Sequence, residues 1–132
     1  MPAALLPCHP RTHRFARSTL EKGPLLVPEQ TVIVCNTADE ARSIGTSWLR
    51  AYLALPNYAN DLLRSGFSED DPAHVSDRLV DAIIARGDED AIMRRAAAHR
   101  GVGADHVCVE VLPADPRAFA REQWRRIAPA CR

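Results

Sequence analysis

The sequence predicts an α/β fold in which helices connect parallel strands. The run "GADHVCVEVLP" at 103–113 alternates β-branched residues at period two, which is typical of a pleated strand. A helical pattern leads into this run and another leads out of it. The same order of strand and helix occurs earlier in the chain, at 30–54. Such βα alternation favours a parallel sheet with helical crossovers. With 132 residues, 46% apolar and 26% charged, the chain suits one small globular domain.

Proline and glycine residues mark the ends of the first predicted strand and helix. Residues 3–7, "AALLP", predict a very short strand. A helix follows, for which Pro10 suits the first turn and Gly23 gives the stop. The apolar run "QTVIVCNT" at 30–37 predicts a buried strand.

A long helix is expected at 38–54. Thr37 and Glu40 form a capping box at its start, and Pro56 ends it. Its apolar residues recur at helical spacing and define one face. They are Ala41, Ile44, Trp48, Leu49 and Tyr52.

The second half of the chain continues the alternation. Its first expected elements are a short helix in 57–67, a polar loop at 68–77 and a helical turn that leads into a short strand at about 82–86. They are followed by a helix capped by Asp88 and ending near Gly101, the strand of 103–113 and a last helix at 117–129. Only three or four strands are therefore available. A complete (β/α)8 barrel needs about 250 residues, so the chain supplies about half of one. An open three-layer sheet is the alternative, although it would be thin.

Four stretches of the sequence resemble a known superfamily. The stretches "GPLLVPEQ", "YLALPNYANDLLRSGF", "SDRLVDAIIARGDEDAI" and "GADHVCVEVLPADP" are similar to the C-terminal half of luciferase-like monooxygenases. Within that superfamily they resemble oxidoreductases that use the deazaflavin coenzyme F420, and the resemblance covers residues 13–128. It implies a cytoplasmic chain whose residues 1–132 form a partial TIM-type barrel domain. It also implies hydride transfer or monooxygenation of a small-molecule substrate with F420, or alternatively FMN.

The resemblance assigns barrel positions to the strands. By analogy, 30–37 is the sixth strand, 82–86 the seventh and 103–113 the eighth, while 3–7 stands where the fifth ends. Strands one to four are missing, so the chain is expected to be truncated and inactive alone. The sequence also departs from the family pattern, because Arg100 stands where relatives carry an apolar residue. Arg100 is therefore expected to face the barrel.

Candidate pocket residues lie after the sixth strand. Asn36 ends that strand and can hydrogen-bond a ligand, although asparagine there is also ordinary cap chemistry. Asn57, Tyr58, Asn60 and Arg64 fall near one another on a short helix, and such insertions line the pocket mouth in this superfamily. A helix cap and a packed tyrosine are the alternative interpretation. No catalytic residue is assigned.

Charge and composition argue against several other functions. Seventeen basic and seventeen acidic residues cancel, so nothing indicates nucleic acid or an anionic membrane as a partner. No apolar run reaches the roughly 18 residues of a membrane span. The four cysteines lack zinc spacing, so no metal is expected, and Cys35 and Cys108 are predicted to be buried free thiols. His99 is expected to be solvated.

A second function class remains open. A half-barrel leaves unpaired edges on its sixth and eighth strands and a broad apolar face. The chain is therefore also interpreted as a non-catalytic module that forms homo-oligomers, or pairs with another chain, through those edges.

Overall fold

The computed structural model describes residues 11–20 and 22–131. The predicted strand at 3–7 lies outside these residues. In chain order the elements are α1 (Arg11–Leu20), β1 (Glu29–Val34), α2 (Ala38–Leu53), α3 (Pro56–Arg64), α4 (Asp70–His74), α5 (Asp77–Ile83), β2 (Ala85–Gly87), α6 (Glu89–Gly101), β3 (Cys108–Val111), α7 (Arg121–Ile127) and the 3-10 turn η1 (Ala128–Cys131).

The strands form a parallel sheet, which confirms the predicted α/β class. The order among the described strands is β2-β1-β3. Val32 of β1 stands in register with Ala85 of β2 on one side and with Val111 of β3 on the other. Consecutive barrel strands are neighbours, so the sixth, seventh and eighth would place β2 in the middle. That expected order is wrong, and so is the expected free edge on the sixth strand, because β1 is paired on both sides.

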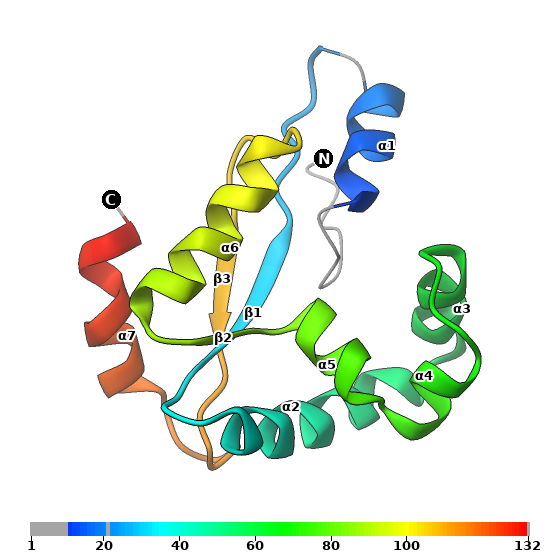
Figure 1. Cartoon of the computed structure of the whole chain (residues 1–132). Coiled ribbons are helices and arrows are strands. Elements are labelled where there is room, and N and C mark those ends of the chain that lie inside the picture. Colours follow the sequence, from blue (N-terminus) through cyan, green and yellow to red (C-terminus); the bar gives the residue numbers. More distant parts are fainter. Residues whose placement is uncertain (1–10, 21, 132) are drawn as a thin grey trace.

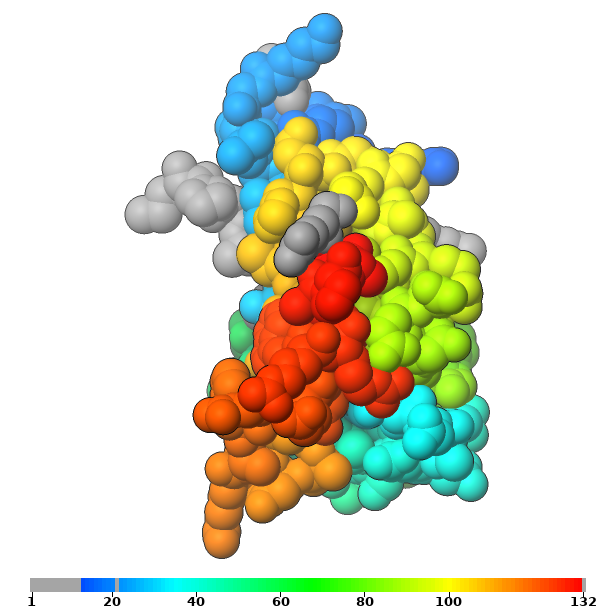
Figure 2. Space-filling model, turned by 90° about the vertical axis from the view of Figure 1, so that its left-hand side faces the viewer, coloured from blue at the N-terminus to red at the C-terminus, as the bar shows by residue number. Residues whose placement is uncertain are grey.

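Helices cover both faces of this sheet (Figure 1). Ile33 of β1 belongs to a core with Ala41 of α2 and Leu79 of α5. Its neighbour Val32 points to the other face, into a core with Ile92 of α6 and Ile127 of α7. Figure 2 shows α6 and α7 side by side over that second face. The described residues therefore form three layers, with the sheet between two layers of helices. The connection from β1 to β2 lies on one face of the sheet and the connection from β2 to β3 on the other.

Helix α2 packs closely against α5 and the residue before β2 at one glycine, Gly45. A Cβ built on Gly45 would come within 2.8 Å of Ile84 Cδ1 and 3.0 Å of Val80 Cγ1. A larger residue at this position would therefore crowd Ile84 and Val80 unless their side chains shift.

The predicted helix caps are confirmed at two places. The Glu40 N–H donates to Thr37 Oγ1 at 3.2 Å at the start of α2. The Ala91 N–H donates to Asp88 Oδ1 at 2.8 Å at the start of α6. Each oxygen satisfies one N–H of a first helical turn, which has no partner within its helix.

One prediction for the middle of the chain is wrong, and another is confirmed with different bounds. The expected loop at 68–77 contains α4, because the Asp71 carboxylate accepts hydrogen bonds from the Ser68 N–H and the Ser76 hydroxyl. Residues up to Ile83 are helical, since Ser76 Oγ caps α5 by accepting from the Leu79 N–H. The strand expected at 82–86 therefore begins only at Ala85.

Three side chains have a different environment from the one predicted. Helix α6 turns Ile92, Ala96 and His99 towards the protein interior. His99 is therefore fully buried rather than solvated, and the next residue, Arg100, is exposed rather than facing the sheet. Cys108 is exposed at the start of edge strand β3, whereas Cys35 is buried as predicted.

Candidate functional site

The carboxyl edge of the sheet contains the position where a ligand is expected in an open α/β fold. The connection after β1 runs to α2 on one face, and the connection after β3 runs to α7 on the other. Ligands of open parallel sheets bind in the crevice at such a switch point. Asn36 is exposed at this edge, immediately after β1. The neighbouring Thr37 hydroxyl already accepts the capping bond of α2.

Acidic residues occupy the first turns of the two long helices that begin at this edge, α2 and α6. Asp39 and Glu40 occupy the first turn of α2. Glu89 begins α6, and its carboxylate accepts a 2.6 Å bond from Arg126 Nε. The bond from Arg126 lowers the pKa of Glu89. This pairing neutralises Arg126, one of the three arginines of α7.

These residues do not fit the coenzymes that the resemblance implies. F420 and FMN both carry phosphate, which favours cations or the positive end of a helix dipole. The long helix that begins at this edge, α2, has carboxylates in its first turn, and these repel phosphate. The described residues therefore do not form a coenzyme cradle by themselves.

Helix α3 carries the other four predicted residues. The helix itself is confirmed, and Asn57, Asn60 and Arg64 lie exposed along it at spacings of three and four residues. Arg64 Nη1 forms an ion pair with Asp61 at 2.7 Å. Tyr58 is half-buried instead.

Tyr58 packs against α2 rather than beside the other candidates. Its ring meets the ring of Tyr52 edge-on, with 5.4 Å between the centroids. Asn36 lies at the opposite end of α2 from α3. At 1.5 Å rise per residue, the 16 residues of α2 span about 24 Å. The structure therefore does not bring Asn36 together with the α3 residues.

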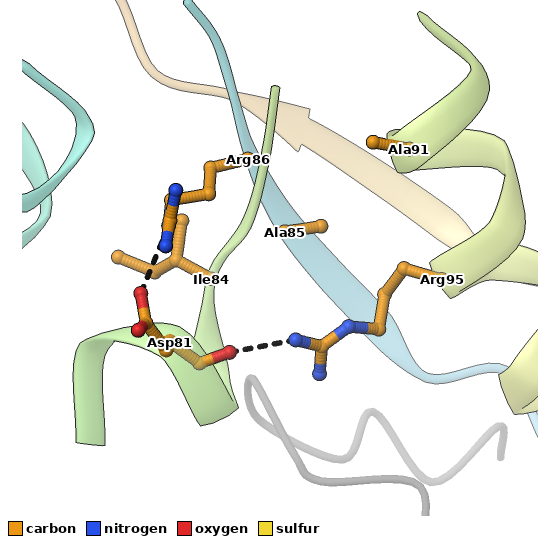
Figure 3. A pocket seen from close by; sticks show the side chains of 6 residues that line it. All are labelled: Asp81, Ile84, Ala85, Arg86, Ala91 and Arg95. Carbon is orange, nitrogen blue, oxygen red and sulfur yellow. Dashed lines mark hydrogen bonds and ion pairs between the residues drawn. The ribbon is translucent and has the colours of Figure 1, made fainter. Parts of the chain in front are cut away.

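A shallow hollow of about 280 Å³ lies along the outer side of β2. Figure 3 shows the side chains of Arg86 and Arg95 both extending towards Asp81, Arg86 from β2 and Arg95 from α6. Its lining consists of Asp81, Ile84, Ala85, Arg86, Ala91 and Arg95. Asp81 Oδ1 accepts a 2.9 Å bond from Arg86 Nε, and Arg42 of α2 lies 3.5 Å from the other carboxylate oxygen. Although burial opposes ionisation, the two arginines lower the pKa of Asp81.

Arg95 is held differently from Arg86. It donates to the Ala82 carbonyl at 2.9 Å and to the Asp81 carbonyl at 2.7 Å, both near the C-terminus of α5. Burial lowers the pKa of Arg95 more than the nearby Asp81 carboxylate raises it. The guanidinium nevertheless remains charged, so Arg95 places a cation in the lining of this hollow.

A buried hydrogen-bond chain was missed by the sequence interpretation. Gln30 Nε2 donates to the carbonyls of Thr31 and Ile83, so its Oε1 is the acceptor. His99 Nε2 must then donate to Gln30 Oε1, at 2.6 Å. His99 Nδ1 is left as the acceptor for His13 Nε2, also at 2.6 Å. The three side chains are fully buried and attach α1 to α6 and β1. The available sequence signal was that His99 and Gln30 occupy positions of a helix and a strand whose neighbours at the same spacing are apolar and face the interior.

A second polar group lies on the α2 face of β1 and β3. Burial, and next the nearby carboxylate of Glu29, raise the pKa of Glu110. Thr31 Oγ1 donates to Glu110 Oε2 at 3.3 Å and partly opposes this rise. Glu110 can therefore hold a proton at a higher pH than an ordinary glutamate. Across the described ranges, no three His, Cys, Asp or Glu side chains are arranged to hold a metal ion.

Within the part of the chain that the structure describes, no helix has both the length and the apolar character to cross a membrane. Comparison with known proteins found no matching family model, curated protein or solved structure.

Proposed function

We propose that this cytoplasmic chain is the C-terminal half of a luciferase-like oxidoreductase that uses F420 or FMN on a small-molecule substrate, and that it is inactive alone. The sequence resemblance over 13–128 carries the proposal. The parallel sheet with helical crossovers supports it at the level of fold class. The strand order counts against a barrel, because β2 would have to move between β1 and β3 once the missing strands were supplied.

Inactivity of the isolated chain has structural support. The carboxyl edge presents Asp39, Glu40 and a neutralised Arg126 rather than a phosphate site. The hollow beside β2, at about 280 Å³, is at the lower limit of typical small-molecule sites and is open rather than enclosed. The rest of a coenzyme cradle must therefore come from other strands.

Titration calorimetry of the purified chain with oxidised and reduced F420 and FMN tests this part. We expect no binding in the micromolar range. Micromolar affinity would overturn the requirement for additional strands. The family assignment is tested separately in the DNA upstream of the codon for Met1, where a reading frame for strands one to five would support it and unrelated sequence would contradict it.

A second candidate is self-association through β3. The Cys108 N–H donates to the Pro28 carbonyl beside β1, so the peptide groups of Val109 face the outer edge. No described strand pairs with that edge. Unpaired strand edges promote association between chains. Light scattering over a wide range of protein concentrations tests this candidate, and a monodisperse monomer throughout would exclude it.

A further inference from the structure

The outer edge of β2 presents unpaired peptide groups. The Cys35 N–H donates to the Gly87 carbonyl at 3.2 Å, so the peptide groups of Gly87 face β1. Because these groups alternate along a strand, the N–H and C=O of Arg86 face away from β1. No described strand pairs with them. A short backbone template is thus available beside the hollow.

Two cations flank this template. Arg86 reaches from β2 to Asp81 of α5, while Arg95 reaches from α6 to the main chain at the end of α5 (Figure 3). Arg86 is paired with a carboxylate. Among the described residues, Arg95 donates to the Ala82 and Asp81 carbonyls, which use two of its five N–H donors. The side of the hollow formed by α6 therefore holds a half-buried cation that is hydrogen-bonded to main-chain carbonyls and, among the described residues, to no carboxylate.

We propose that the outer edge of β2 accepts an extended acidic segment of a partner protein as an additional strand, with carboxylates that meet Arg95 and Arg86. Main-chain hydrogen bonds to Arg86 would supply affinity, and the side chains would supply specificity. Successive side chains of a strand point to opposite faces, so two adjacent acidic residues reach the two arginines. This inference concerns a partner site and is independent of the proposed oxidoreductase function.

The direct test uses two blocked peptides, Thr-Val-Glu-Glu-Val-Thr and its counterpart Thr-Val-Gln-Gln-Val-Thr. We expect the acidic peptide to bind about tenfold more tightly, which corresponds to one charge-assisted interaction. Amide hydrogen exchange locates the bound peptide. Exchange at the Arg86 amide should slow about tenfold on saturation with the acidic peptide, while the Gly87 amide, already directed to β1, should change little.

Matched variants separate the role of Arg95 from general charge. Arg95→Gln should weaken binding of the acidic peptide about tenfold, whereas Arg94→Gln, at the exposed neighbouring position of α6, should leave it unchanged. Circular dichroism monitors the fold, because Arg95 also binds carbonyls of α5. The comparison of the two peptides on the unaltered chain remains decisive if Arg95→Gln fails to fold.

Several outcomes would overturn the proposal. Equal binding of the two peptides would remove the charge argument, and an unchanged Arg86 amide would remove strand addition. Equal protection of that amide by inorganic phosphate would indicate an anion subsite only. Protection that rises with protein concentration in the absence of peptide would identify a second copy of this chain as the occupant.

Discussion

Replacing His99 by leucine tests the buried hydrogen-bond chain. The substitution removes the partner of His13 Nε2 and of Gln30 Oε1, each 2.6 Å away within a fully buried site. A buried polar group that loses its partner costs about 1–3 kcal/mol. Two such groups cost about 2–6 kcal/mol, and burial of leucine, worth about 1.5–3 kcal/mol, offsets part of this.

We therefore expect His99→Leu to lower the free energy of unfolding by about 1–3 kcal/mol, a sizeable share of the roughly 5–15 kcal/mol of a typical domain. Urea denaturation followed by circular dichroism gives this difference. Arg100→Leu is the matched control, because it replaces the exposed neighbour in the same helix and should change stability by less than about 0.5 kcal/mol.

A double variant isolates the pair. Combining His99→Leu with Gln30→Leu should lower the free energy of unfolding by less than the sum of the two single variants. The reason is that His99→Leu leaves Gln30 Oε1 without its donor, and this oxygen is absent when Gln30 is leucine. The reasoning is refuted if His99→Leu is as stable as the parent chain. It is also refuted if Arg100→Leu costs as much as His99→Leu, since α6 would then present a different face to the sheet.

Three further predictions concern charge and packing. Burial and Glu29 raise the folded pKa of Glu110 above its ordinary 4.5, so its stabilising contribution is lost as pH rises through the folded value. Glu110→Gln should therefore be more stable than the parent near neutral pH but not below pH 4.5, as urea midpoints at both pH values will show. Hydrogen bonds from Ser76 and Ser68 lower the pKa of Asp71 in the folded chain below 3.8, so Asp71→Asn should reduce the melting temperature at neutral pH. The reduction should shrink as the pH falls through the pKa of Asp71 in the folded chain, and a pH-independent difference would contradict this prediction. Gly45→Ala should lower the free energy of unfolding, measured by urea denaturation, by about 1 kcal/mol, because overpacking costs about 1–3 kcal/mol and the better helix propensity of alanine returns about 1 kcal/mol. A more stable alanine variant would show that the Ile84 side chain moves aside.

The sequence alone predicted those features that depend on near neighbours in the chain. The caps of Thr37 and Asp88 are confirmed because a cap joins residues three apart. The core strand β1, the long helix α2 and the parallel class are confirmed because hydrophobic period and βα alternation are local patterns. Helix α4 was missed, since it depends on Asp71 bonding to residues on both of its sides rather than on an apolar period.

Tertiary structure decided the strand order and the environment of the polar groups. A period-two pattern assigns each side chain to a face but does not choose which strand lies alongside, so β1 rather than β2 took the centre of the sheet. The pairing of His13 with His99 joins residues 86 positions apart. The hollow beside β2 likewise combines a helix end, a strand edge and an arginine from the next helix. Such contacts depend on how crossovers pack against the sheet, because only packing brings distant backbone and charge within hydrogen-bond distance.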